Sequence, residues 1–279
     1  MAGITISSGV RNNLLALQQT ASLMSQTQNR LATGKKVNSA LDNANSFFTA
    51  SSLNSRADDL STLLDDQSQA VQTLKAADQG ISGIKKLVEA AKAKANQALS
   101  SSSTTDRGAF ASEYNNLLGQ IEDLAKDSGY NGKNLLSGDD VKVVFNEKTG
   151  SEQASLSITG VDYSNTSSAL SLSDLTAGDW ASGTTGDNNI NGAIDKLNNA
   201  LTTLRNQAST FGTNLTVVQN RQDFTKNMIN TLQEGADNLT NADTNEEGAK
   251  LLALQTRQSL SSTALSMASS ADQAVLRLF

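Results

Sequence analysis

The two ends of the chain carry apolar residues at the same alternating spacing of four and three residues. Near the N-terminus this repeat runs through Val10, Leu14, Leu17, Ala21, Met24, Gln28 and Leu31. Near the C-terminus it runs through Leu260, Ala264, Met267, Ala271, Ala274 and Leu278. The spacing predicts that each end forms a long helix that packs along another helix.

The other faces of these two helices lack charge. No Lys, Arg, Asp or Glu occurs between Arg11 and Arg30, or between Arg257 and Asp272. A solvated helix usually carries Lys and Glu on its polar face, whereas small uncharged side chains suit contact with protein. We therefore expect neighbouring copies to cover both ends in an assembly. Its core would contain Leu14, Leu17, Ala21, Met24, Leu31, Leu260, Ala264, Met267, Ala271 and Leu278.

The apolar residues of these repeats are few and small for the length of chain that must be ordered. Ala, Gln and Ser occupy many positions and bury little hydrocarbon. Burial must exceed the conformational entropy that is lost on ordering the chain. We therefore expect the two ends to be disordered in the isolated chain and to fold when neighbouring copies cover them.

The composition of the 279 residues narrows the possible chemistry. The chain contains no His, Cys or Pro, so it lacks an imidazole base, a thiol nucleophile and the usual ligands of structural zinc. The absence of Pro suits long uninterrupted helices. A net charge of −6 argues against a nucleic-acid partner, and no apolar run approaches the roughly 18 residues of a membrane span. We expect no catalytic residue, no cofactor, no metal and no membrane insertion.

The pattern along the chain predicts a mainly α fold of long antiparallel helices in coiled-coil or bundle layers. Helices are expected over 1–33, about 46–99, 107–126 and 190–239, and after a capping box formed by Thr244 and Glu247. Between them, Val141–Phe145 and Leu156–Ile158 alternate like a β-hairpin within a glycine-rich region at about 128–189.

This order predicts two layers, each built from both halves of the sequence. Residues 1–44 with 241–279 form a terminal helical domain, and residues 45–240 form an inner helical domain that includes the hairpin. The single tryptophan, Trp180, lies in a Ser/Gly-rich stretch. A tryptophan in such a stretch more often anchors a loop on the body of the protein than binds a ligand. We therefore predict that Trp180 anchors a loop.

Several separate blocks resemble bacterial flagellin, the subunit of the flagellar filament. Residues 13–17 read NLLAL, and residues 30–44 (RLATGKKVNSALDNA) are similar to the family's RLSSGLRINSAxDDAA. Residues 77–81 (ADQGI), 219–221 (QNR), 238–239 (NL), 242–243 (AD), 246–247 (EE) and 273–279 match further family blocks in order. The resemblance covers about 1–140 and 190–279.

The resemblance implies a structural subunit that polymerises with itself into the helical filament used for swimming. It implies export through the flagellar type III channel and an extracellular location. This fits residues 1–11, which lack the basic and apolar segments of a secretory signal peptide. Further implied partners are sister flagellins, an export chaperone, and the junction and cap proteins. Only about 50 residues separate the helical halves, so no outer domain is expected.

Two alternatives stay open at this point. A hook–filament junction protein shares flagellin-like ends, although the short glycine-rich middle favours flagellin. A secreted membrane-active translocator would have amphipathic ends with Lys or Arg on the polar face and Trp or Phe on the other. Residues 12–29 contain none of these four residue types.

The resemblance also points to a segment that would face an immune receptor. In the family, the Toll-like receptor for flagellin contacts an inner-helix segment similar to QRVRELA, and residues 85–91 here read KKLVEAA. This makes Lys86, Val88 and Glu89 the candidate receptor-facing residues. Lys86 lacks the planar fork of Arg, and Val88 replaces a second Arg, so weak receptor activation is expected.

Overall fold

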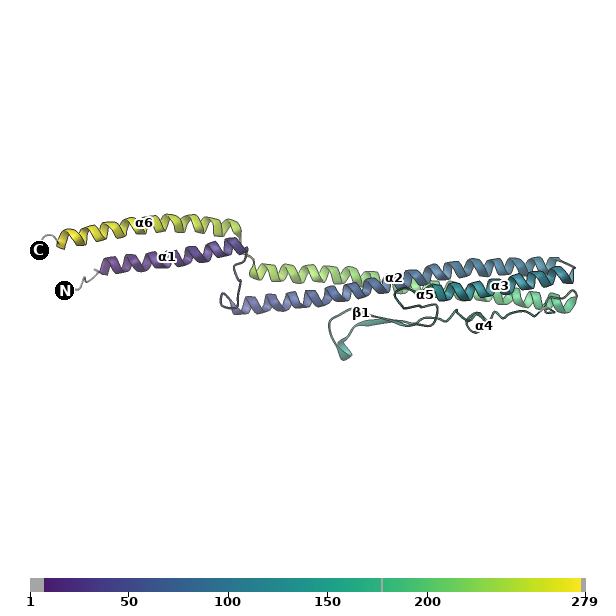
Figure 1. The fold of residues 1–279 in the computed structure, drawn as a ribbon. Helices are drawn as coiled ribbons and strands as arrows, with labels where there is room; N and C mark the ends of the chain where they lie inside the picture. Colours follow the sequence, from purple (N-terminus) through teal and green to yellow (C-terminus); the bar gives the residue numbers. More distant parts are fainter. Residues whose placement is uncertain (1–7, 177, 277–279) are drawn as a thin grey trace. The chain divides into compact units, whose positions relative to one another are not determined.

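The computed structural model describes residues 8–176 and 178–276, and it is mainly helical (Figure 1). The long helices are α1 (Ser8–Thr33), α2 (Ala44–Ser100), α3 (Thr104–Asp127), α5 (Thr184–Thr240) and α6 (Thr244–Leu276). The middle of the chain adds β1 (Val141–Val144), a 3-10 turn (Gly150–Glu152), β2 (Ser155–Ile158) and the short α4 (Thr166–Ala169). The predicted fold class and the order of its elements are confirmed.

The contacts divide the chain into two compact units. The terminal unit comprises Met1–Arg56 and Thr231–Phe279, and the inner unit comprises Ala57–Asn230. Helices α2 and α5 each pass from one unit into the other. Helix α5 is continuous from Thr184 to Thr240, and its polar Thr225 is buried.

The inner unit has a closely packed apolar core. Helices α2, α3 and α5 run side by side in Figure 1. Their buried faces contribute Leu74, Ile81, Ile84, Val88, Leu118, Ile121, Leu197, Leu204 and Phe211 to one cluster. Trp180 is also buried, with its ring 5.3 Å from that of Tyr114. Trp180 therefore anchors a loop on the helices, as the sequence led us to expect.

A buried arginine joins the loops at one end of the inner unit. Arg107 donates hydrogen bonds to the carbonyl oxygens of Ser101 (2.7 Å) and Ala181 (3.1 Å). It also pairs with the Asp187 carboxylate at 2.6 Å. A buried charge is costly unless it is paired in this way. These contacts tie the α2–α3 connection to the start of α5.

The predicted hairpin is confirmed. Strands β1 and β2 are antiparallel, with Val141 opposite Ile158 and Val144 opposite Ser155. Alternate side chains point into the inner unit, and Val143 and Ile158 are buried. The amide nitrogen Nε2 of the buried Gln67 on α2 donates to the carbonyl oxygen of Val144 at 3.2 Å. This contact attaches the hairpin to the helices.

The start of α6 differs from the predicted capping box. The Oδ1 atom of Asp243 accepts hydrogen bonds from the backbone amides of Asn245 (2.8 Å) and Glu246 (3.2 Å). Asp243 is therefore the cap, and Thr244 is already helical. The pairing of Thr244 with Glu247 was wrong because Asp at the preceding position is an equally good cap residue. Glu247 instead contacts α1.

Candidate assembly surface on the terminal helix pair

Helices α1 and α6 lie side by side and run in opposite directions (Figure 1). Backbone hydrogen bonds close the base of the pair: the amide of Lys36 donates to Thr240 O at 2.7 Å, and that of Ala242 donates to Gly34 O at 2.9 Å. Gly34 ends α1 with φ of +69°, which the residue after a helix often requires. The two helices thus form one antiparallel pair.

An ion pair near this base joins the two helices. Arg30 Nη1 and Lys250 Nζ lie 3.3 Å and 3.2 Å from the buried Glu247 Oε1. Burial acts to raise the pKa of Glu247, but the hydrogen bonds and charges of Lys250 and Arg30 outweigh it and hold the pKa below its usual range. The carboxylate therefore stays charged at neutral pH.

The contact between the two helices is partly polar on both sides. On α1 the two most buried residues are threonines, Thr20 and Thr27, and the apolar Leu17 and Met24 are half-buried. On α6 the half-buried residues that follow the same four-three spacing are Leu251, Leu254, Gln258, Ser261, Leu265 and Ala268. Polar residues at such positions reduce the apolar area that the pair buries, and with it the stabilisation.

Most of the apolar repeat predicted at the C-terminus, apart from Ala264, does not lie on the face of α6 that is buried in the pair. Leu260 and Met267 are 66% and 64% exposed. Together with Ala253 and Ala274, which are also exposed, they are spaced seven residues apart along one side of α6. We call Ala253, Leu260, Met267 and Ala274 the outer stripe. The four-three spacing is present twice on α6, and the more apolar set faces outward.

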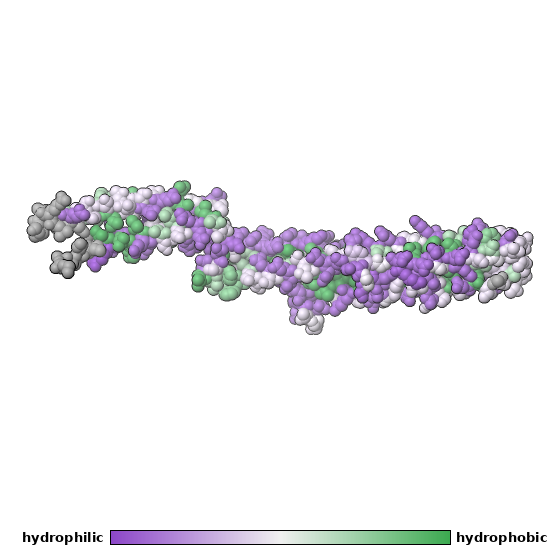
Figure 2. Space-filling view, in the orientation of Figure 1, coloured by the Kyte–Doolittle hydropathy of each residue, from purple (hydrophilic) through white to green (hydrophobic). Residues whose placement is uncertain are grey.

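The remaining predicted core residues are divided between the two faces. Leu17, Ala21, Met24 and Ala264 are half-buried, whereas Leu14, Leu31 and Ala271 are exposed. Leu278 lies outside the described residues. Three further exposed leucines of α1 and α6 lie outside the predicted repeats: Leu15, Leu23 and Leu252. Figure 2 shows hydrophobic side chains gathered over the visible face of α1.

Large exposed apolar side chains are concentrated in the terminal unit. Among the described residues, nine of the twelve lie there, and Tyr130, Val217 and Phe224 are the three in the inner unit. Such a concentration of exposed large apolar side chains is typical of an interaction surface. The two ends of the chain therefore still carry an unsatisfied surface after they have paired with each other.

The three candidate receptor-facing residues do not share one face. Lys86 and Glu89 are exposed on α2, but Val88 is completely buried in the core of the inner unit. Val88 is therefore corrected to a packing residue, because a side chain with no accessible surface cannot contact a receptor on a folded subunit. For Lys86 and Glu89 the assignment stays a prediction.

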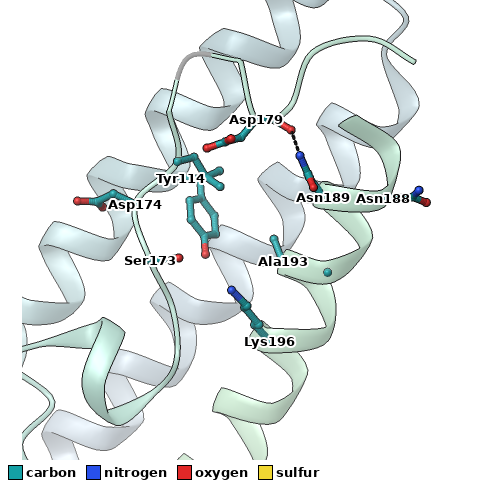
Figure 3. Close-up of a pocket in the computed structure, with 10 residues that line it drawn as sticks. Tyr114, Ser173, Asp174, Asp179, Asn188, Asn189, Ala193 and Lys196 are labelled. Carbon is teal, nitrogen blue, oxygen red and sulfur yellow. Dashed lines mark hydrogen bonds between the residues drawn. The ribbon is translucent and has the colours of Figure 1, made fainter. Parts of the chain in front are cut away.

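A polar pocket of about 290 Å³ opens on the inner unit between α3, α5 and the loop that precedes α5 (Figure 3). Tyr114 and Lys196 point toward the same space, and Asn189 Nδ2 donates to Asp179 O at 2.8 Å. Burial, with the nearby Asp174 charge, raises the pKa of Tyr114 to about 12. Its phenol stays protonated at neutral pH, so Tyr114 does not provide a general base there.

Across the described segments, no helix is both long enough and apolar enough to cross a bilayer.

Comparison with known proteins identifies the family. Residues 8–140 match the bacterial flagellin N-terminal helical region, and residues 194–279 match the bacterial flagellin C-terminal helical region. The flagellin FljN of Caulobacter vibrioides is 30% identical over 99% of this chain and 98% of its own length. The chain belongs to the bacterial flagellin family.

A second flagellin sequence agrees with this membership. A flagellin of Brucella melitensis is 28% identical over 100% of this chain and 99% of its own length. A crystal structure of Bacillus cereus flagellin superimposes with a TM-score of 0.47, at 19% identity, over 57% of this chain and 88% of that chain. Flagellins are structural subunits of the extracellular flagellar filament and not enzymes. Several can occur in one organism, as with FljN, FljO, FljM and FljK of Caulobacter vibrioides.

Proposed function

We propose that this flagellin polymerises by burying, between neighbouring subunits, the outer stripe of α6 and the exposed leucines of α1. The observation that carries this proposal is the exposure of Leu260 and Met267 in an α6 segment without charge. Each such side chain gains about 1–2 kcal/mol when the rest of its surface is buried. That gain recurs in every subunit of a filament.

The two predicted domains become the layers of this proposed filament. Residues 1–44 with 241–279 form its core, and residues 45–240 form the layer around it. In the core, Leu14, Leu17, Ala21, Met24 and Leu31 of one subunit pack with Leu260, Ala264, Met267, Ala271 and Leu278 of its neighbours. The uncharged polar side chains between them suit this environment, because they leave no ion to be buried without a partner.

The proposal extends to partners that act before and during assembly. An export chaperone would cover the outer stripe while the subunit is still in the cell, since the stripe is exposed in the free chain. A chain without Cys has no disulfide to hinder passage through the type III channel in an unfolded state. Junction and cap proteins and sister flagellins would contact the same terminal helices at the ends of, and along, the filament.

Met267→Lys tests the assembly proposal. The side chain is 64% exposed in the free chain, so the charge costs little there. Burial in a filament would leave an unpaired ammonium and cost several kcal/mol per subunit. We expect no filaments by electron microscopy and sedimentation, together with an almost unchanged thermal unfolding curve of the monomer.

Two control variants distinguish the effect of the added charge from the effect of changing residue 267. Thr149→Lys adds the same charge to the exposed hairpin loop and should still polymerise. Met267→Leu keeps the site apolar and should polymerise like the wild type. Normal filaments from Met267→Lys would show that the outer stripe is not buried on assembly.

A further inference from the structure

Outside α1 and α6, large apolar side chains are exposed at two places that contain charge. In the terminal unit, Leu41 is 98% exposed on the turn between α1 and α2, and Phe48 follows it in the first part of α2. In the inner unit, Phe224 is 55% exposed on α5, with Val217 exposed two turns earlier. Neither place contributes to the uncharged stripes that the assembly proposal uses.

The turn that carries Leu41 is held in place by its own hydrogen bonds. The Oδ2 atom of Asp42 accepts from the backbone amides of Asn38 and Ser39, both at 3.0 Å. The amide of the buried Val37 donates to Thr240 O at 3.2 Å, which ties the turn to the end of α5. A leucine presented on such a turn loses little conformational entropy when it binds, and this favours its use as an anchor.

The exposed residues of α5 form a face that combines apolar surface with a positive charge. Val217, Arg221 and Phe224 are spaced four and three residues apart, so they lie on one side of the helix. The guanidinium carbon of Arg221 lies 5.3 Å from the centre of the Phe145 ring. This cation–π contact holds the guanidinium over the Phe145 ring, and Arg221 itself lies between Val217 and Phe224 along the helix.

We propose that Leu41 and Phe48 of one subunit dock on the Val217–Arg221–Phe224 face of a neighbouring subunit, with the Asp42 carboxylate directed toward Arg221. Apolar surface then meets apolar surface, and opposite charges face each other. The uncharged stripes of α1 and α6 are poorer partners, because they offer no opposite charge to Asp42 or to Arg221.

This proposal rests on the assembly proposed above and adds a second contact to it. The two surfaces differ from each other, so the contact is heterologous: each subunit offers the turn to one neighbour and the α5 face to another. A heterologous contact whose rotation does not close into a ring continues along a helical polymer, which fits the proposed filament. It would connect the terminal unit of one subunit to the inner unit of the next.

Single cysteines can test the contact cleanly because the chain has none of its own. We would mix Leu41→Cys and Phe224→Cys subunits that carry tags of different mass, form filaments, and oxidise them mildly. Any disulfide between the two tags must join different subunits. A disulfide requires Cα atoms within about 7 Å, so we expect at least about tenfold more heterodimer than in a control filament. The control combines Leu41→Cys with Thr202→Cys, an exposed position elsewhere on α5.

A second variant measures the contribution of the leucine. Leu41→Ser should raise the critical concentration for polymerisation about tenfold, with an unchanged unfolding curve of the monomer. Wild-type chains that form no filaments would contradict the assembly proposal itself. Filaments with no more heterodimer than the control, or with an unchanged critical concentration for Leu41→Ser, would overturn this contact alone.

Discussion

The inner and terminal units use helices of similar spacing but bury very different residues. In the inner unit, Ile84, Val88 and Ile121 have no exposed surface. In the terminal unit, the two most buried residues of α1 are Thr20 and Thr27, while Leu260 of α6 is largely exposed. The inner unit thus satisfies its apolar faces within one chain, and the terminal unit keeps part of its apolar surface for other molecules.

This difference shows how one chain can combine a stable body with ends that respond to assembly. Free energy of folding is concentrated where apolar area is buried, so the inner unit should govern global unfolding. The terminal pair is helical in the structure. That the ends lose order in the free chain stays a prediction, and the partly polar contact between α1 and α6 supports it because this pair should open far more readily than the inner unit.

The largest expected effect is a difference in local opening between the two units. In dilute monomer, amide hydrogens of α1 and α6 should exchange on the order of 100-fold faster than those of α3, because opening the pair exposes little apolar area. Hydrogen exchange followed by mass spectrometry measures this, and limited proteolysis should cut the ends first. In filaments the ends should become protected. Equal protection of both units in the monomer would mean that the terminal pair does not open more readily than the inner unit.

Two side-chain truncations, one in each unit, should measure how much each unit contributes to the free energy of unfolding. Ile121→Ala removes a fully buried side chain of the inner unit and should lower the free energy of unfolding by about 2–5 kcal/mol. Leu265→Ala removes a half-buried side chain of the terminal pair and should lower it by less than about 1 kcal/mol. The fluorescence of Trp180, the only tryptophan, reports on the inner unit during denaturant unfolding.

Helicity measured on the same samples provides the control for these truncations. Leu265→Ala should lower the helical signal before the Trp180 transition, since the terminal pair opens first. If both variants shifted the Trp180 transition equally, the two units would unfold as one cooperative body. The terminal pair would then not be less stable than the inner unit.

The sequence predicted the elements well because the signals for them are local. Periodic apolar residues gave the helices, and the alternation around Val143 and Leu156 gave the hairpin. The sequence could not decide which face of α6 meets α1. The set with Leu251, Leu254 and Leu265 and the set with Leu260 and Met267 have the same spacing, and only the tertiary contact separates them. The burial of Thr20 and Thr27 was not predicted, because the repeats were defined by apolar residues and threonine is polar.

Burial also could not be assigned from the family resemblance alone. The resemblance placed Val88 among the candidate receptor-facing residues, yet it is buried in this chain. Arg107 and Asp243 were likewise not singled out, since their roles depend on carbonyl and amide groups that the fold brings near them. The exposed Leu41 has no periodic partner, so its position on a fixed turn is visible only in three dimensions.

The smallest predicted effect concerns acid and the base of the terminal pair. Because the pKa of Glu247 is lowered in the folded chain, its ion pair stabilises the fold above the unfolded pKa of about 4.3. That stabilisation is lost as the pH falls through the folded pKa. Lys250 and Arg30 supply the positive charges, and Glu246 also pairs with Lys250. As the pH falls through that pKa, the base of the pair should therefore loosen before the inner unit does.

Glu247→Gln should remove this dependence, because it keeps the shape of the side chain and discards the charge. At pH 7 the amides at the end of α1 should exchange about tenfold faster in the variant than in the wild type. As the pH falls through the folded pKa of Glu247, the two proteins should converge, since the wild-type carboxyl becomes protonated. Comparing them at each pH cancels the intrinsic pH dependence of exchange. Equal protection at pH 7 would mean that the ion pair does not hold α1 against α6, and the polar contact along the helices would then have to account for the pair by itself.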